Sequence, residues 1–192
     1  AEDWGGTGAI VTPTAVGGAG FNAQWDAGFV HPVREALITM DDAARNIGAV
    51  ANAVTNLYGV DPFTSVIYTE SHDEVANGKS RVPESISPGD AGNYHAKKRS
   101  TLGLVLVFTT QGIPMLFMGK EFLEDQWFED TRPLDWAKTE AYSGILQLNR
   151  DLMVLRRNGH NTTKGLQGRN VTTYHVNIQD NVLAYHRWWD GG

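Results

Sequence analysis

The stretch from Phe63 to Tyr68 constrains the fold of this chain more than any other. Its β-branched and aromatic residues predict a short strand that is buried on both faces. Such strands occur mainly in parallel sheets, which helices cover. The polar run Glu70-Ser71-His72-Asp73-Glu74 follows almost at once. Because sites in barrels of parallel strands gather at the carboxyl ends of those strands, this run is a candidate site.

Helix-like and strand-like segments alternate along the first 158 residues. This alternation predicts an α/β protein, and two successive strands ending in acidic turns, the second at Glu121, favour a (β/α)8 TIM barrel. A complete barrel takes about 250 residues, whereas about three βα units can be counted, so we expect part of a barrel. The expected elements are helices over 41–57, 94–110 and 140–157, strands over 63–68 and 114–118, and loops over 1–36 and 70–92, with a short strand near 21–25.

The last part of the chain has a different pattern. Two alternating segments, Val171 to Ile178 and Val182 to Trp189, predict an antiparallel hairpin joined by Gln179-Asp180-Asn181. We therefore place a domain boundary near Gly159. Residues 1–158 are expected to form the partial barrel, and residues 159–192 the beginning of an all-β domain.

Composition excludes several classes of function. The 22 acidic and 16 basic side chains give a net charge of −6 without a block of like charge, which argues against nucleic acid and anionic membranes as partners. The chain has no cysteine, so it contains no disulfide or cysteine nucleophile, and this absence is typical of a cytoplasmic protein. The six histidines lack zinc-ligand spacing. We expect a neutral polar substrate, and neither a metal nor a cofactor.

Several motifs together resemble the glycogen and starch branching enzymes of the α-amylase superfamily, glycoside hydrolase family 13. They are "TESHDEVANGK", "GIPMLFMGKEF", "PLDW" and the opening "AEDWGGTGAIVTPTAVGGAGFNAQWD". The resemblance implies a segment from the end of the fifth barrel strand to the eighth strand and its helix, followed by the start of the C-terminal β-domain. The implied activity is retaining transfer of an α-1,4-glucan segment to a 6-hydroxyl. An α-amylase-type hydrolase of α-1,4-glucan and a non-catalytic glucan-binding fragment stay open as alternatives.

The resemblance also implies roles for individual residues. Asp73 would stabilise the transition state, His72 would bind the sugar at the cleavage subsite, and Glu2 would be the general acid/base. Trp4 and Trp127 are candidates for glucan-binding platforms or for packing under loops. Glu121 is a candidate substrate-binding carboxylate or the polar cap of a strand. The expected ligand is an α-glucan such as amylose, glycogen, starch or a maltooligosaccharide.

In the family, the nucleophilic aspartate and an arginine two residues before it lie upstream of the position that Glu2 would occupy. We therefore expect a partial chain that is inactive in isolation. Exposed strand edges of a partial barrel favour pairing with the missing barrel half or with a second copy.

Overall fold

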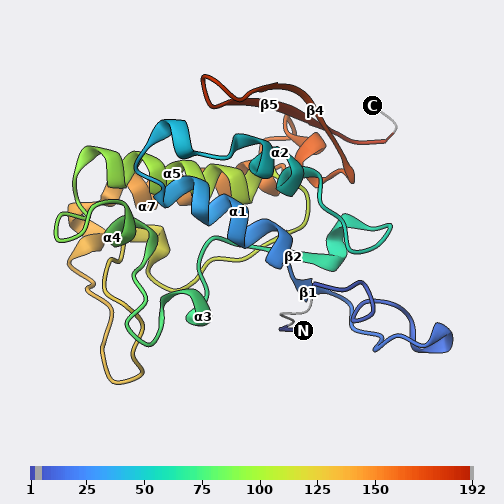
Figure 1. Cartoon of the computed structure of the whole chain (residues 1–192), viewed down its shortest axis with the longest axis horizontal. Helices are drawn as coiled ribbons and strands as arrows, with labels where there is room; N and C mark the ends of the chain where they lie inside the picture. Colours follow the sequence, from blue (N-terminus) through green and yellow to red (C-terminus); the bar gives the residue numbers. More distant parts are fainter. Residues whose placement is uncertain (3–5, 191–192) are drawn as a thin grey trace.

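The computed structural model of the chain describes residues 1–2 and 6–190. Within these residues, three parallel strands form a sheet, helices α1, α2, α5 and α7 lie on one side of it, and a two-stranded hairpin packs against α2 (Figure 1). The strands are β1 (Gln24–Trp25), β2 (Ser65–Ile67), β3 (Ile113–Pro114), β4 (Asn170–Asn177) and β5 (Val182–Trp188). The α-helices are α1 (Ala27–Ile38), α2 (Ile47–Thr55), α3 (His72–Val75), α4 (Val82–Ile86), α5 (Tyr94–Thr109), α6 (Lys138–Ala141) and α7 (Ser143–Arg156). Short 3-10 helices are η1 (Thr14–Val16), η2 (Asp42–Ala44), η3 (Pro62–Thr64), η4 (Lys120–Phe122) and η5 (Lys164–Gln167).

The sheet has the order β1-β2-β3 with all neighbours parallel, as the alternating pattern predicted. Trp25 pairs with Val66, and Val66 pairs with Ile113 on its other side. The strand predicted over 63–68 is present but shorter. Its first residues form η3 because the Asp61 side chain accepts a hydrogen bond from the Phe63 amide and Pro62 starts the helical turn.

The core lies between this sheet and the helices. Ile67 of β2 belongs to one buried cluster with Phe29 and Val33 of α1, Val50 of α2 and Val107 of α5. All five side chains are almost fully buried. Burial of each such side chain stabilises the fold by about 1.5–3 kcal/mol, so this cluster sets the position of the sheet relative to the helices.

Helix α1 contradicts the expectation of a loop over residues 1–36. The Asp26 side chain caps the first turn, because its Oδ1 accepts a hydrogen bond from the Phe29 amide at 3.0 Å. Phe29 and Val33, four residues apart, bury the same face. The signal was obscured by Pro32 inside the helix, which removes a backbone donor, and by the glycine-rich stretch before it.

The expectation of a loop over 70–92 is also wrong in part. The one-turn helix α3 and the short helix α4 lie in this stretch. Val75 of α3 and Val82 of α4 are fully buried and Ile86 of α4 is almost fully buried, so these apolar side chains hold the helices against the core. These helices are too short for the sequence periodicity to reveal.

The remaining expected helices are present with shifted ends. Helices α5 and α7 confirm those predicted over 94–110 and 140–157. Helix α2 begins at Ile47 because the Asn46 side chain caps it, whereas Asp41 caps η2 and Asp42 begins it. The strand predicted over 114–118 is present only in part, because β3 ends at Pro114 and residues 115–118 are not in a strand.

Strands β4 and β5 confirm the predicted hairpin, with a bulge between Thr173 and His175. Side-chain contacts fasten it to the helices. The hydroxyls of Tyr185 and Thr109 lie 2.5 Å apart, and the Asn181 side-chain amide donates to the Asp42 carbonyl at 2.8 Å. None of the helices in the described part of the chain combines the length and the apolar character needed to cross a bilayer.

Arg156, at the end of α7, caps the carboxyl end of α5. Its buried guanidinium donates to the carbonyls of Phe108 at 3.3 Å, of Thr110 at 2.5 Å and of Gly112. Carbonyls at the end of a helix lack intrahelical donors and carry partial negative charge. Burial, and then the neighbouring Arg187, lowers the pKa of Arg156 to about 10, so the guanidinium stays charged at neutral pH.

Substitution of Arg156 by leucine should lower the free energy of unfolding by about 3 kcal/mol, because buried carbonyls lose a charged donor. Urea denaturation of the 192-residue chain measures this change. The matched control is Arg157→Leu at the exposed next position, which should change stability by less than about 0.5 kcal/mol. Equal effects of the two substitutions would contradict the capping role.

Candidate active site

The chain presents His72 and Asp73 where β2 leaves the core. The strand ends at Ile67, and Thr69, Glu70 and Ser71 after it are all at most 2% exposed. Helix α3 then begins at His72, so both candidate side chains belong to its first turn. The pair therefore lies at the carboxyl end of a parallel strand, as the sequence predicted.

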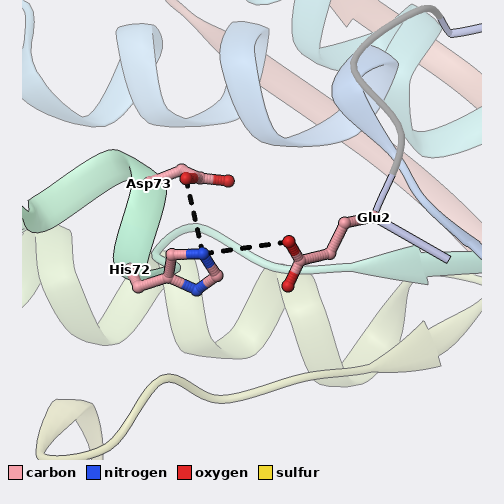
Figure 2. Close-up of side chains that lie close together, drawn as sticks. All are labelled: Glu2, His72 and Asp73. Carbon is pink, nitrogen blue, oxygen red and sulfur yellow. Dashed lines mark ion pairs between the residues drawn. The ribbon is translucent and has the colours of Figure 1, made fainter.

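Glu2 reaches the same edge of the sheet through backbone pairing. The terminal amino group of Ala1 donates to the Ala23 carbonyl at 2.6 Å, and the Trp25 amide donates to the Ala1 carbonyl at 2.9 Å. Ala1 is therefore hydrogen-bonded to the edge of β1 that faces away from β2. Figure 2 shows the result: the carboxylates of Glu2 and Asp73 both face the imidazole of His72.

The imidazole lies between the two carboxylates. Nε2 of His72 is 3.8 Å from Oε2 of Glu2 and 3.4 Å from Oδ1 of Asp73 (Figure 2). One oxygen of each carboxylate and one imidazole nitrogen all lie within 4.8 Å of one another. The Asp73 side chain is 26% exposed, whereas those of His72 and Glu2 are about half exposed, so a ligand in solution can reach all three.

Trp25 contacts the His72 ring and Tyr68 contacts Trp25, and the sequence analysis assigned neither of these aromatic residues a role in the site. The ring centroid of Trp25 lies 5.5 Å from that of His72 and 5.2 Å from that of Tyr68, both edge to face. Burial, and then the negative charges of Glu74 and Asp73, raises the pKa of Tyr68, so its phenol stays neutral. The pairing of Trp25 with Val66 in the sheet places the indole under the turn, a contact that required the strand register to find.

A buried ion pair lies directly behind this turn. Glu70 and Arg81 are each 1% exposed, and Arg81 Nη1 lies 3.5 Å from Glu70 Oε2. Glu70 Oε1 also accepts a hydrogen bond from the Val82 amide at 2.6 Å. Arg81 donates further to the carbonyls of Met118 at 2.9 Å and Gln126 at 2.7 Å. The pair therefore joins the end of β2 to the segment after β3.

Lys120 adds a second cation to this buried pair. Its Nζ lies 3.9 Å from Glu70 Oε1 and has no hydrogen-bond partner within residues 1–2 and 6–190. Burial lowers the pKa of Lys120, and the positive charges of Arg34 and Arg81 lower it further, while Glu70 opposes the shift. Removal of Glu70 would therefore leave two buried cations, Arg81 and Lys120, without their counter-charge.

The loop after η4 is held by a second buried carboxylate, Glu124. Its oxygens accept hydrogen bonds from the amides of Asp125, Gln126 and Asp135 at 2.8–3.2 Å, and from Lys138 Nζ at 2.8 Å. Burial raises the pKa of Glu124, but these hydrogen bonds outweigh burial and leave the pKa below its usual value. Glu124 thus shapes the loop that carries Trp127.

The other candidate residues are not in the Glu2–His72–Asp73 cluster. Glu121 is half-buried in η4, and its backbone carbonyl accepts a hydrogen bond from Asn149. Trp127 lines a cavity of about 380 Å³ in the loop after η4. Trp4 lies outside the described residues. Glu121, Trp127 and Trp4 all stay predictions as substrate contacts.

The cluster has several chemical uses. Its two carboxylates can accept hydrogen bonds from hydroxyls or transfer protons, and the imidazole can donate to a hydroxyl. Each of the three residues could also offer one ligand atom to a cation. Exposed acidic groups are common without a bound ion, so this grouping alone assigns no metal.

Comparison with known proteins identifies relatives by sequence. No protein-family model matches the chain. It is 36% identical over 150 residues to the 1,4-alpha-glucan branching enzyme GlgB of Synechococcus elongatus, and the aligned region covers 76% of this chain and 18% of that protein. It is 32% identical over 151 residues to the GlgB of Prochlorococcus marinus, covering 78% of this chain and 19% of the relative. The chain is thus homologous to a segment of branching enzymes, and it spans about a fifth of their length.

Solved structures confirm the relationship at the level of fold. The pullulanase of Anoxybacillus sp. LM18-11, complexed with maltotetraose, matches with a TM-score of 0.62 and 21% identity, over 85% of this chain and 26% of that chain. The apo pullulanase of Paenibacillus barengoltzii matches with a TM-score of 0.59 and 18% identity, over 85% of this chain and 28% of that chain. The resemblance to branching enzymes, inferred from the motifs, is confirmed by the sequence relatives.

The lowered pKa of Glu124 leads to a prediction about acid stability. Its interactions stabilise the fold above the pKa of glutamate in the unfolded chain, and this contribution is lost as the pH falls through the lowered pKa. Between about pH 6 and about pH 3, the stability of the wild type should therefore fall more steeply than that of Glu124→Gln. Urea denaturation followed by tryptophan fluorescence at each pH measures the slopes. The control is Glu140→Gln, at an exposed position of α6, which should keep the wild-type slope. If the slope of Glu124→Gln equals that of the wild type, Glu124 does not cause the loss of stability in acid.

Proposed function

We propose that these residues form part of the active site of a 1,4-α-glucan branching enzyme, with Glu2, His72 and Asp73 at its centre. The observation that carries the proposal is the imidazole of His72 between two carboxylates, at the edge where β2 ends. The branching enzymes to which the chain is homologous support the substrate and the reaction. Because the chain spans about a fifth of those relatives, the activity is proposed for a polypeptide that includes it.

The proposed reaction breaks an α-1,4 bond and joins the released segment to a glucan 6-hydroxyl. Retaining transfer needs a nucleophile and a group that acts first as acid and then as base. Glu2 is proposed to protonate the leaving oxygen and then to accept the proton of the attacking 6-hydroxyl. Between these two steps the donor segment is held as a glycosyl ester of a carboxylate nucleophile, which attacks the sugar as the α-1,4 bond breaks and which the rest of the polypeptide supplies.

Asp73 and His72 are proposed to hold the sugar ring. Hydrogen bonds from ring hydroxyls to the Asp73 carboxylate strengthen as the ring flattens toward an oxocarbenium ion, which favours the transition state over the bound substrate. The imidazole donates to a sugar hydroxyl from a position that Trp25 maintains by its edge contact. Trp127, Trp4 and Glu121 are proposed as further glucan contacts.

The strand order supports an assignment within the barrel. If β2, which precedes the His72–Asp73 turn, is the seventh barrel strand, then β1 is the sixth and β3 the eighth. Ala1, paired beside β1, then belongs to the end of the fifth strand. We propose that residues 1–158 are this part of the catalytic barrel and that residues 159–192 begin the C-terminal β-domain.

The 192 residues alone should not cleave amylose. Within residues 1–2 and 6–190, the group of acidic and imidazole side chains whose ligand atoms lie within 4.8 Å of one another contains Glu2, His72 and Asp73 and no third carboxylate that could act as nucleophile. New reducing ends in amylose incubated with the chain should therefore stay at the level of the buffer control. Cleavage by the purified chain that Asp73→Asn abolishes would contradict this prediction.

The roles of the carboxylates can be tested in a chimera. This chain replaces its aligned segment in the Synechococcus elongatus branching enzyme, which supplies the rest of the barrel. Glu2→Gln and Asp73→Asn should each lower the initial rate of amylose modification by about 10²-fold or more, because the first removes the proton donor and the second removes a charge that stabilises the transition state. The fall in iodine absorbance of amylose measures the rate.

The matched control for these two variants is Asp151→Asn, on the exposed face of α7. It should keep the rate of the unsubstituted chimera. An active chimera whose rate is unaffected by Asp73→Asn would overturn the proposed site.

A further inference from the structure

A cavity of about 490 Å³ lies where the hairpin meets the end of α5. Its walls come from the last residue of α5, from the segment around η5 and from β5, and they include Thr109, Thr162, Thr163, Tyr185 and Arg187. Helix α5 leads into the amino end of β3, whereas His72 follows the carboxyl end of the parallel strand β2. The cavity is therefore at the opposite end of the strands from the proposed active site.

Arg187 brings a positive charge to the wall of this cavity. Its guanidinium donates to the carbonyls of Asn170 and Thr109, both at 3.0 Å, of Leu166 at 3.3 Å and of Gly168. These bonds use the hydrogen on Nε, both hydrogens on Nη2 and one of the two on Nη1. The second hydrogen on Nη1 is left for a ligand in the cavity. Burial lowers the pKa of Arg187 to about 10, so the side chain is charged at neutral pH.

Arg156 adds a second positive charge to this region. Burial, and then the charge of Arg187, lowers the pKa of Arg156, so the two guanidiniums lie within electrostatic reach of each other. All the hydrogen bonds that the described residues give these two guanidiniums end on backbone carbonyls. Among the described residues, Tyr185 is the one acidic group that favours the charged form of either arginine, and tyrosine is neutral at pH 7.

The other buried cations in the described part of the chain have carboxylate partners. Each of them lies 2.8–3.9 Å from an oxygen of a glutamate, and they are Arg34, Arg81, Lys120 and Lys138. A buried charge without a counter-charge is strongly unfavourable. The pair of Arg156 and Arg187 therefore departs from the way in which this fold compensates its buried cations, and an anion in the cavity would supply the counter-charge.

The hydroxyl groups of the cavity wall are of two kinds. Thr109 donates its proton to the carbonyl four residues earlier in α5 at 2.7 Å, so the Tyr185 hydroxyl donates to Thr109 at 2.5 Å. Thr163 donates to the Leu155 carbonyl at 2.6 Å. Thr162 is exposed in the same wall, and its hydroxyl can donate to a ligand. None of the lining residues in the described part of the chain is acidic, so the wall does not repel an anion.

We propose that this cavity binds the phosphoryl group of a small anion, either inorganic phosphate or a sugar phosphate. Arg187 Nη1 and the Thr162 hydroxyl donate to the phosphoryl oxygens, and Arg156 contributes charge without touching the ligand. Guanidinium donors form short, charge-assisted hydrogen bonds with such oxygens. Cavities of about 300–1,000 Å³ are typical of ligand sites, so this one has room for a sugar attached to the phosphate.

The experiment titrates the 192-residue chain with inorganic phosphate and with glucose 6-phosphate, and glucose is the uncharged control. Two-dimensional ¹H–¹⁵N NMR should show saturable shifts of the Arg187 Nε–H and of the amides of Thr162 and Gly165, complete by about 10 mM of either anion. Glucose should leave these resonances in place. Arg187→Gln should weaken binding of both anions by about tenfold or more, because it removes the charge that faces the ligand.

A second variant tests the site at an exposed position, where the fold does not depend on the side chain. Thr162→Asp places a negative charge in the wall and should also weaken binding by about tenfold or more. Thr131→Asp makes the same change of charge at an exposed position in the loop before α6. This matched control should bind phosphate like the wild type.

Several results would overturn the assignment. They are the absence of a saturable shift with either anion, shifts confined to residues outside the cavity, glucose binding as tight as that of glucose 6-phosphate, or unchanged affinity in Thr162→Asp. If Arg187→Gln does not fold, Thr162→Asp decides the question. Tighter binding of glucose 6-phosphate than of phosphate would identify a sugar phosphate as the ligand, and equal affinity would identify free phosphate. Both of these results uphold the site.

Discussion

The buried carboxylate of Glu70 is the point on which the arrangement of the candidate site depends. It lies two residues before His72, accepts a hydrogen bond from the first residue of α4, and faces Arg81 and Lys120 in a region from which solvent is excluded. Arg81 extends the connection to the carbonyls of Met118 and Gln126. The buried ion pair of Glu70 and Arg81 therefore connects the end of β2, helix α4 and the loop after β3. Loss of either partner would leave a charge buried, which is far more costly than loss of a surface ion pair.

This buried connection explains how an exposed cluster can have a defined geometry. Glu2, His72 and Asp73 are open to ligands, and their mutual distances of 3.4 and 3.8 Å exceed those of strong hydrogen bonds. Their positions are instead fixed by contacts outside the cluster. These are the backbone pairing of Ala1 with Trp25, the contact of Trp25 with His72 and the buried ion pair of Glu70 and Arg81. An open cluster on rigid elements leaves its hydrogen-bonding capacity for the ligand.

Sequence reasoning was successful for the strand, where a local pattern carried the information. The run from Phe63 to Tyr68 predicted a buried parallel strand, which β2 confirms, and the polar residues proposed as the site follow its carboxyl end. Helix α1 was missed because Pro32 and the preceding glycines hide its apolar spacing, although Asp26 supplied a capping signal. Helices α3 and α4 are too short for any period to show.

The supporting residues could not be predicted because their partners are distant in sequence. Arg81 and Gln126 are 45 residues apart, and Trp25 contacts His72 across neighbouring strands. Glu124 and Lys138 resemble ordinary surface charges in the sequence, and only the folded loop buries them together. Contacts of this kind follow from strand register and loop closure, which no local window contains.

The products of the chimera with amylose test the central claim most directly. Proton NMR counts new α-1,6 linkages, and a reducing-sugar assay counts new chain ends in the same sample. The account predicts that linkages rise while reducing ends stay nearly constant, because each cleaved segment is transferred to a 6-hydroxyl. Reducing ends that rise without new linkages would contradict transfer and would identify a hydrolase built on the same carboxylates.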